Sequence, residues 1–86
     1  MAVYTVTNKM LLDNFAVIQL LTNFDGSVGS TVTVAGVGSP FNGTFVVRDL
    51  PQYRFIGVDD QGELLFDASQ ELENQVLYAC TGSDVD

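Results

Sequence analysis

The chain has 86 residues, of which 47% are hydrophobic, and its net charge at neutral pH is −8. This length allows one domain with one core, and the hydrophobic fraction excludes a disordered polar chain. A strongly negative protein repels phosphate groups, so nucleic acid is not expected as a partner.

No stretch of the sequence predicts a membrane span, because about 18 apolar residues in a row are needed for one. The longest apolar run, residues 15–21, is interrupted by Gln19. The N-terminal residues lack the basic and apolar regions of a signal peptide. We therefore expect no membrane partner, and a soluble chain that is made in a cytoplasm.

Strand-forming segments follow one another along the first part of the chain. Residues 2–7 have an alternating pattern that includes β-branched residues, so they predict a strand. Residues 9–14 predict a connection that ends in a turn at Asp13-Asn14. Residues 15–21 carry apolar side chains on both faces, which is typical of a central or doubly covered strand. Residues 22–30 are rich in Asn, Asp, Gly and Ser and predict a loop.

The middle of the chain predicts two strands and a tight turn. Residues 31–34 read Thr-Val-Thr-Val, which places the valines inward and the threonines outward. The pair Asn42-Gly43 lies between apolar segments, and both residues tolerate a positive φ, so we expect a hairpin turn there. Residues 44–48 predict the next strand, with Phe45 and Val47 facing inward.

Two more strands are expected beyond residues 50–52, where Pro51 turns the chain because it cannot donate a ladder hydrogen bond. Residues 53–58 form the first of them. Residues 63–66 pair back with it as a short strand, and an acidic turn at residues 59–62 joins the two.

The last part of the chain predicts a helical turn and a final strand. Residues 67–70 have the spacing of a helix capping box, so residues 68–73 predict one short helix. Residues 74–80 predict the final strand, and residues 81–86 a polar tail. The pattern is therefore that of an all-β protein, a small antiparallel barrel or sandwich of six to seven strands in a single domain of residues 1–86.

The sequence offers little that could perform chemistry. It contains no histidine, the usual partner of a serine or cysteine nucleophile. Cys80 lies in an apolar run and is interpreted as a small buried hydrophobic residue. Glu71 and Glu73 lie two residues apart with no cleft implied, so they are poor candidates for a general acid and base. Residues 59–63 lack the alternating acidic spacing of a calcium loop. The prediction is a protein that is not an enzyme, with no catalytic, cofactor-binding or metal-binding residues.

The negative charge is concentrated in the C-terminal part of the chain. Arg54 is the last of the three basic residues, and eight of the eleven acidic residues follow it. Two interpretations are open. The favoured one is a solvated face that keeps the protein in solution, and the other is a surface that docks on a basic patch of a partner.

Several segments carry a family likeness through the order of their β-branched, aromatic and turn residues. They are residues 28–37 (VGSTVTVAGV), 41–47 (FNGTFVV) and 50–51 (LP), with Tyr53 and Phe55 in an aromatic strand, and upstream residues 7–9 (TNK) and 14–18 (NFAVI). Together they resemble a β-module that is common in virion proteins of tailed phages, particularly actinobacteriophages. The likeness covers roughly residues 5 to 58.

The resemblance implies a structural protein of a phage virion that is assembled in the cytoplasm of the bacterial host. A stand-alone copy of the module resembles a capsid decoration (minor capsid) protein, which stabilises the head by bridging capsid subunits. Its implied partners are the major capsid protein and further copies of itself.

Two other functions are open at this point. One is a head–tail connector or tail accessory subunit of the same virion. The other is a host- or carbohydrate-binding β-module, which would present exposed aromatic side chains on a concave face. The available tyrosines are Tyr4, Tyr53 and Tyr78.

Overall fold

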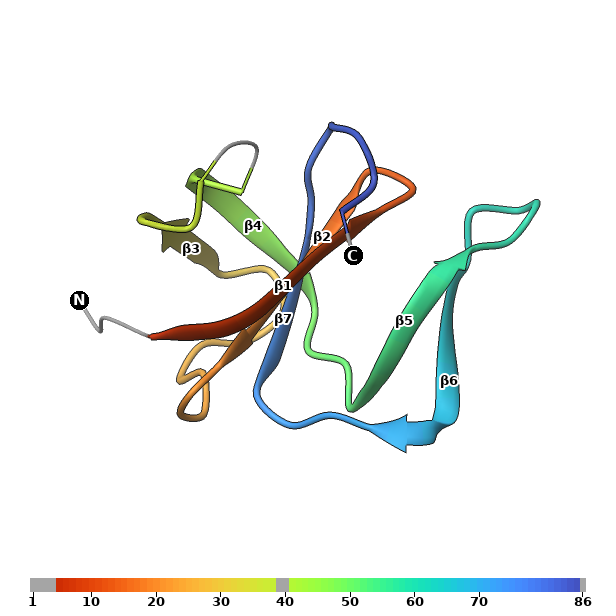
Figure 1. Ribbon diagram of the computed structural model, residues 1–86, viewed down its shortest axis with the longest axis horizontal. Helices are drawn as coiled ribbons and strands as arrows, with labels where there is room; N and C mark the ends of the chain where they lie inside the picture. The colour runs from red at the N-terminus through yellow and green to blue at the C-terminus, as the bar shows by residue number, and fades with distance from the viewer. Residues whose placement is uncertain (1–4, 39–40, 86) are drawn as a thin grey trace.

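The computed structural model describes residues 5–38 and 41–85, and over these ranges the chain forms seven strands and no helix (Figure 1). Five strands form one sheet in the order β1-β2-β7-β4-β3, and the other two form a separate hairpin, β5-β6. Every pairing is antiparallel. The bounds are β1 (Val6–Leu12), β2 (Phe15–Leu20), β3 (Thr31–Val34), β4 (Gly43–Asp49), β5 (Tyr53–Val58), β6 (Leu64–Glu71) and β7 (Gln75–Ala79).

This arrangement confirms the all-β, antiparallel prediction, and it is sandwich-like rather than a closed barrel. The short helix expected at residues 68–73 is absent from the described chain, because β6 continues to Glu71. In the same described ranges there is no helix of the length and apolarity that crossing a membrane would need.

The first hairpin is longer than its sequence suggests. Strand β1 runs to Leu12, so the prediction of a connection over residues 9–14 was wrong except for its final turn. Asp13 and Asn14 form that turn with φ values of 52° and 65°, which fits a two-residue hairpin loop. Strand β1 extends this far because Leu11 is fully buried between neighbours while Met10 packs on the opposite side. Of the strand expected at residues 2–7, residues 2–4 lie outside the described residues.

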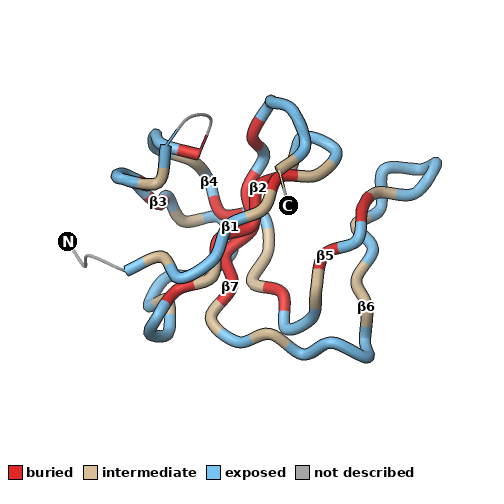
Figure 2. Tube along the Cα trace, viewed as in Figure 1, coloured by how far each residue is buried: buried red, intermediate tan, exposed pale blue. Residues whose placement is uncertain are grey.

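Strands β2 and β7 form the centre of the molecule and are covered on both faces (Figure 2). In β2, Ile18 belongs to a large cluster on one face, while Val17 belongs to a smaller cluster on the other. In β7, Tyr78 and Leu77 divide between the two clusters in the same way. The predicted doubly covered strand is therefore confirmed. The large cluster comprises Leu11, Ala16, Ile18, Leu20, Val32, Val34, Phe41, Val47, Val76, Tyr78 and Cys80.

The β3–β4 pair confirms the predicted inward valines but not the predicted turn. Gly43 is the first residue of β4 and pairs with Val34, so residues 35–42, not a tight Asn42-Gly43 turn, connect the strands. The Asn42 side chain instead accepts hydrogen bonds from the backbone N–H groups of Val37 (3.0 Å) and Gly38 (3.2 Å). Gly43 does adopt a positive φ, of 143°, but it does so at the start of β4 and not in a hairpin turn.

The helix predicted at residues 68–73 was wrong for a local reason. A capping box would place the Gln70 N–H on the Asp67 carboxylate. Asp67 instead accepts hydrogen bonds from the Ser69 N–H (2.9 Å) and hydroxyl (2.6 Å), a local contact that Asp also makes outside helices. No helical turn follows, because the Leu72 N–H bonds to Gln52 of the neighbouring chain segment (2.9 Å). The bonds to Asp67 lie within a bulge of β6, in which residues 68–70 have no partner between the Arg54–Asp67 and Tyr53–Glu71 pairs.

The β5–β6 hairpin forms a second, smaller layer. Figure 1 shows it standing away from the five-stranded sheet, joined by one segment before β5 and one after β6. Its Phe55 is fully buried against Val17 and Leu77 of the sheet, and Phe66 packs at the edge of this cluster. The turn predicted at residues 59–62 closes the tip, and in it the Asp59 carboxylate accepts hydrogen bonds from the N–H groups of Gln61 (2.8 Å) and Glu63 (2.9 Å).

Candidate functional site

Cys80 and Tyr78 both lie buried in the large cluster. Cys80 is 6% exposed, and burial raises the pKa of its thiol, which favours the protonated form. Tyr78 is fully buried, its hydroxyl donates to the Phe41 carbonyl (3.0 Å), and burial raises the pKa of its phenol above the ordinary value. Across residues 5–38 and 41–85, no three His, Cys, Asp or Glu side chains gather where they could hold a metal ion. The candidate site is therefore sought among surfaces that can bind a partner.

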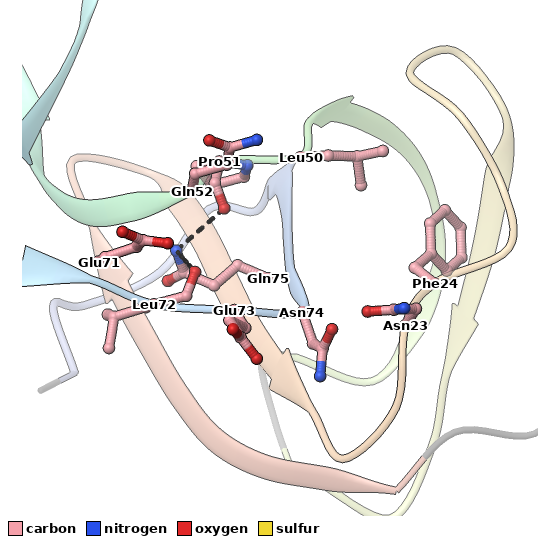
Figure 3. A pocket seen from close by; sticks show the side chains of 10 residues that line it. All are labelled: Asn23, Phe24, Leu50, Pro51, Gln52, Glu71, Leu72, Glu73, Asn74 and Gln75. Atoms are coloured by element: carbon pink, nitrogen blue, oxygen red, sulfur yellow. Dashed lines mark hydrogen bonds between the residues drawn. The ribbon is translucent and has the colours of Figure 1, made fainter.

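A hollow lies at the root of the β5–β6 hairpin (Figure 3). It measures about 670 Å³, and Glu71 and Glu73 both line it, although no cleft was expected beside them from the sequence. Both carboxylates are exposed to solvent, and four side-chain amides complete the polar part of the wall. The lining residues are Asn23, Phe24, Leu50, Pro51, Gln52, Glu71, Leu72, Glu73, Asn74 and Gln75.

Gln75 fixes the root of the hairpin, and sequence analysis missed it. Its side chain is 5% exposed, and its Nε2 atom lies within hydrogen-bonding distance of the carbonyls of Pro51 (3.1 Å), Tyr53 (3.0 Å) and Leu72 (3.3 Å). These carbonyls belong to the two segments that enter and leave the hairpin, so one amide joins both (Figure 3). The only available signal was a polar residue at the start of an otherwise apolar strand.

The outer part of the hairpin is held by the turn between β1 and β2. The Asp13 carboxylate accepts a hydrogen bond from the Val58 N–H (3.1 Å), while the Asp13 N–H donates to the Asp84 carboxylate (3.2 Å). Gly57 allows this approach, because a Cβ atom on it would lie 3.1 Å from an oxygen of Asp13. The hairpin is thus attached at both ends by polar contacts and between them by the smaller apolar cluster.

The hairpin and its root carry most of the negative charge. Residues 53–73 hold six carboxylates and one guanidinium, which is a net charge of −5 out of −8 for the whole chain. Hydrogen bonds from Ser69 lower the pKa of Asp67, and Arg54 on the neighbouring strand lowers it further, so this carboxylate is ionised at neutral pH. Six of the eight acidic residues that follow Arg54 therefore lie in the hairpin and its root.

The hairpin also exposes apolar side chains. Ile56 is 50% exposed and Leu65 is 40% exposed. Leu65 lies between Leu64 and Phe66, which both pack toward the sheet, so strand alternation directs it to the opposite side. Ile56 likewise follows the fully buried Phe55. The sheet therefore covers one face of the hairpin, through Phe55 and Phe66. Ile56 is the extra residue of β5 beside the Gly57–Leu65 pair, so the two half-exposed side chains are neighbours, and we call the surface around them the outer face of the hairpin.

The two tyrosines that the structure describes lie in different environments. Tyr78 is buried in the large cluster, and Tyr53 is partly exposed on β5. Tyr4 lies outside the described residues.

No protein-family model, no curated protein sequence and no solved structure matches the chain. The resemblance to phage virion proteins therefore remains a prediction from the sequence.

Proposed function

We propose that this protein is a non-catalytic structural subunit of a phage virion, a capsid decoration protein that bridges neighbouring capsid subunits. The observation that carries the structural role is the β5–β6 hairpin, an acidic element that stands away from the sheet with apolar side chains exposed. The placement in a virion is supported by the resemblance of residues 28–37 and 41–47, and the all-β fold agrees with the fold that the resemblance implies.

The proposed mechanism is burial of surface, with no bond made or broken. A decoration protein that binds two subunits of an assembled shell adds interface that exists only in the assembled state, and it therefore stabilises that state by mass action. Such a protein needs a rigid body and an accessible docking element. Here a doubly covered central sheet forms the body, and Gln75 holds the hairpin at a fixed position on it.

A deletion experiment tests the proposal. Heads assembled without the protein are expected to form, because the shell's own subunits make the primary contacts, but to release their DNA at a lower temperature than wild-type heads. Adding the purified protein back should restore the release temperature. Cryo-electron microscopy should show many copies at fixed positions on the outer capsid. Equal release temperatures, or density only at the portal or tail, would reject the decoration role and favour the connector or tail alternative.

A further inference from the structure

The outer face of the β5–β6 hairpin has exposed apolar side chains and a rim of carboxylates. A two-stranded hairpin is marginally stable alone and needs apolar cover. The sheet covers only its inner face, through Phe55 and Phe66, while Ile56 and Leu65 stay half exposed on the other side. Neighbouring exposed apolar side chains with a polar rim have the composition of a protein interaction surface.

The charge around this face determines which kind of partner fits. Asp60 and Glu63 lie exposed in the turn at its tip, and the ionised Asp67 lies on β6 across from Arg54. A second copy of the hairpin and its root would bring another net charge of −5 against the same surface, and like charges placed together disfavour such an interface. Charge complementarity instead calls for a partner surface that carries lysine or arginine.

We propose that the outer face of the hairpin binds a protein surface with an apolar centre flanked by lysine or arginine side chains. Ile56 and Leu65 supply the apolar contact, and Asp60, Glu63 and Asp67 supply the complementary rim. The proposal rests on the proposed function for the identity of the partner, which is a capsid subunit with such a surface, but the docking face itself is defined by this chain alone.

The first experiment measures binding of the purified protein to heads that lack it. The variants Ile56→Thr and Leu65→Thr remove apolar surface and keep residues that favour strands. The matched control is Val46→Thr, because Val46 is 53% exposed on β4, away from the hairpin. We expect each hairpin variant to bind about tenfold more weakly and Val46→Thr to bind as wild type. Equal effects of all three substitutions would overturn the proposal, and a denaturation midpoint for each variant verifies that it is folded.

The rim is tested by salt and by charge. Wild-type affinity for the heads should fall as the salt concentration rises, since exposed charges are screened over about 8–10 Å at physiological ionic strength. The double variant Asp60→Asn, Glu63→Gln should bind more weakly at low salt and lose part of this dependence. Asp59 is left intact because its carboxylate closes the turn. An affinity that is indifferent to salt in both proteins would contradict a basic partner.

A second probe separates failure of this inference from failure of the proposed function. If wild-type protein does not bind heads at all, the decoration role fails, and the docking face is then tested with a short amphipathic leucine–lysine peptide followed by NMR. Chemical-shift changes should centre on Ile56 and Leu65, and Val28 and Val46 should not respond. Changes spread evenly over all exposed apolar residues would overturn the docking face. A concentration-dependent dimer of the protein alone that Leu65→Thr abolishes would instead identify a second copy as the occupant.

Discussion

Replacing Gln75 with methionine should strongly destabilise the fold, although the two side chains have similar length. The Gln75 amide has two N–H hydrogens to share among the carbonyls of Pro51, Tyr53 and Leu72. Each hydrogen bond contributes about 1 kcal/mol net, and an acceptor left buried without a partner costs about 1–3 kcal/mol. We therefore expect Gln75→Met to lower the free energy of unfolding by about 2–4 kcal/mol, a large part of the stability of a small domain.

Gln19 provides a matched control for this substitution. It is the cross-strand partner of Gln75, on β2, and its amide donates one hydrogen bond to the Glu73 carbonyl (3.0 Å) at a more exposed position. Gln19→Met should therefore cost less than about 1 kcal/mol in the same assay. Urea unfolding gives both values, provided that the slopes agree.

A local measurement tests the reasoning further. Loss of the Gln75 amide should accelerate hydrogen exchange at the Leu72 N–H, which bonds to Gln52 at the root of the hairpin. Amides in the centre of β2 should be affected less. If Gln75→Met and Gln19→Met cost the same, or if exchange at Leu72 is unchanged, then Gln75 does not hold the hairpin in the way described.

Three further predictions concern other parts of the molecule. Hydrogen bonds from Ser69 lower the folded-state pKa of Asp67, so its stabilising contribution is present above the unfolded pKa of about 4 and is lost as the pH falls through the folded value. Asp67→Asn should flatten the acid side of a plot of urea midpoint against pH, and an unchanged slope would contradict this. Cys80 should react with a thiol reagent in the native protein only as fast as the protein opens, because its thiol is buried and has a raised pKa. Rapid labelling of the native protein at pH 8 would mean that the thiol is accessible. Asn14→Val should lower the free energy of unfolding by about 1–3 kcal/mol in urea unfolding, because a β-branched residue resists positive φ. Asn14→Gly should cost clearly less. Equal costs would mean that backbone strain at residue 14 does not account for the loss of stability.

Periodicity in the sequence was enough to determine the strands whose side chains divide cleanly between two environments. Residues 31–34 alternate threonine and valine, and the structure buries Val32 and Val34 while the threonines face solvent. The apolar residues on both faces of β2 correctly predicted a strand covered on two sides. These predictions hold because burial on a pleated strand follows a period of two, which is a local property of the chain.

Local signals misled where one side-chain interaction serves several structures. Asp67 bonds to Ser69 both in a helix cap and in an irregular strand, and only the pairing of Leu72 with Gln52 decides between them. Asn42-Gly43 fits a tight turn or a strand start, and the pairing of Gly43 with Val34 selects the second. In both cases the deciding contact joins residues that are distant in the sequence, so no window of local sequence contains it.

The candidate docking element shows the same division. The sequence by itself determined that the acidic residues follow Arg54 and that residues 53–66 form two strands. Only the tertiary structure decided that these strands leave the main sheet, that Gln75 fastens their root, and that Ile56 and Leu65 stay exposed while Phe55 is buried. The physical reason is that a strand pattern specifies which side chains share a face, whereas the cover for each face comes from elements elsewhere in the chain or from a partner.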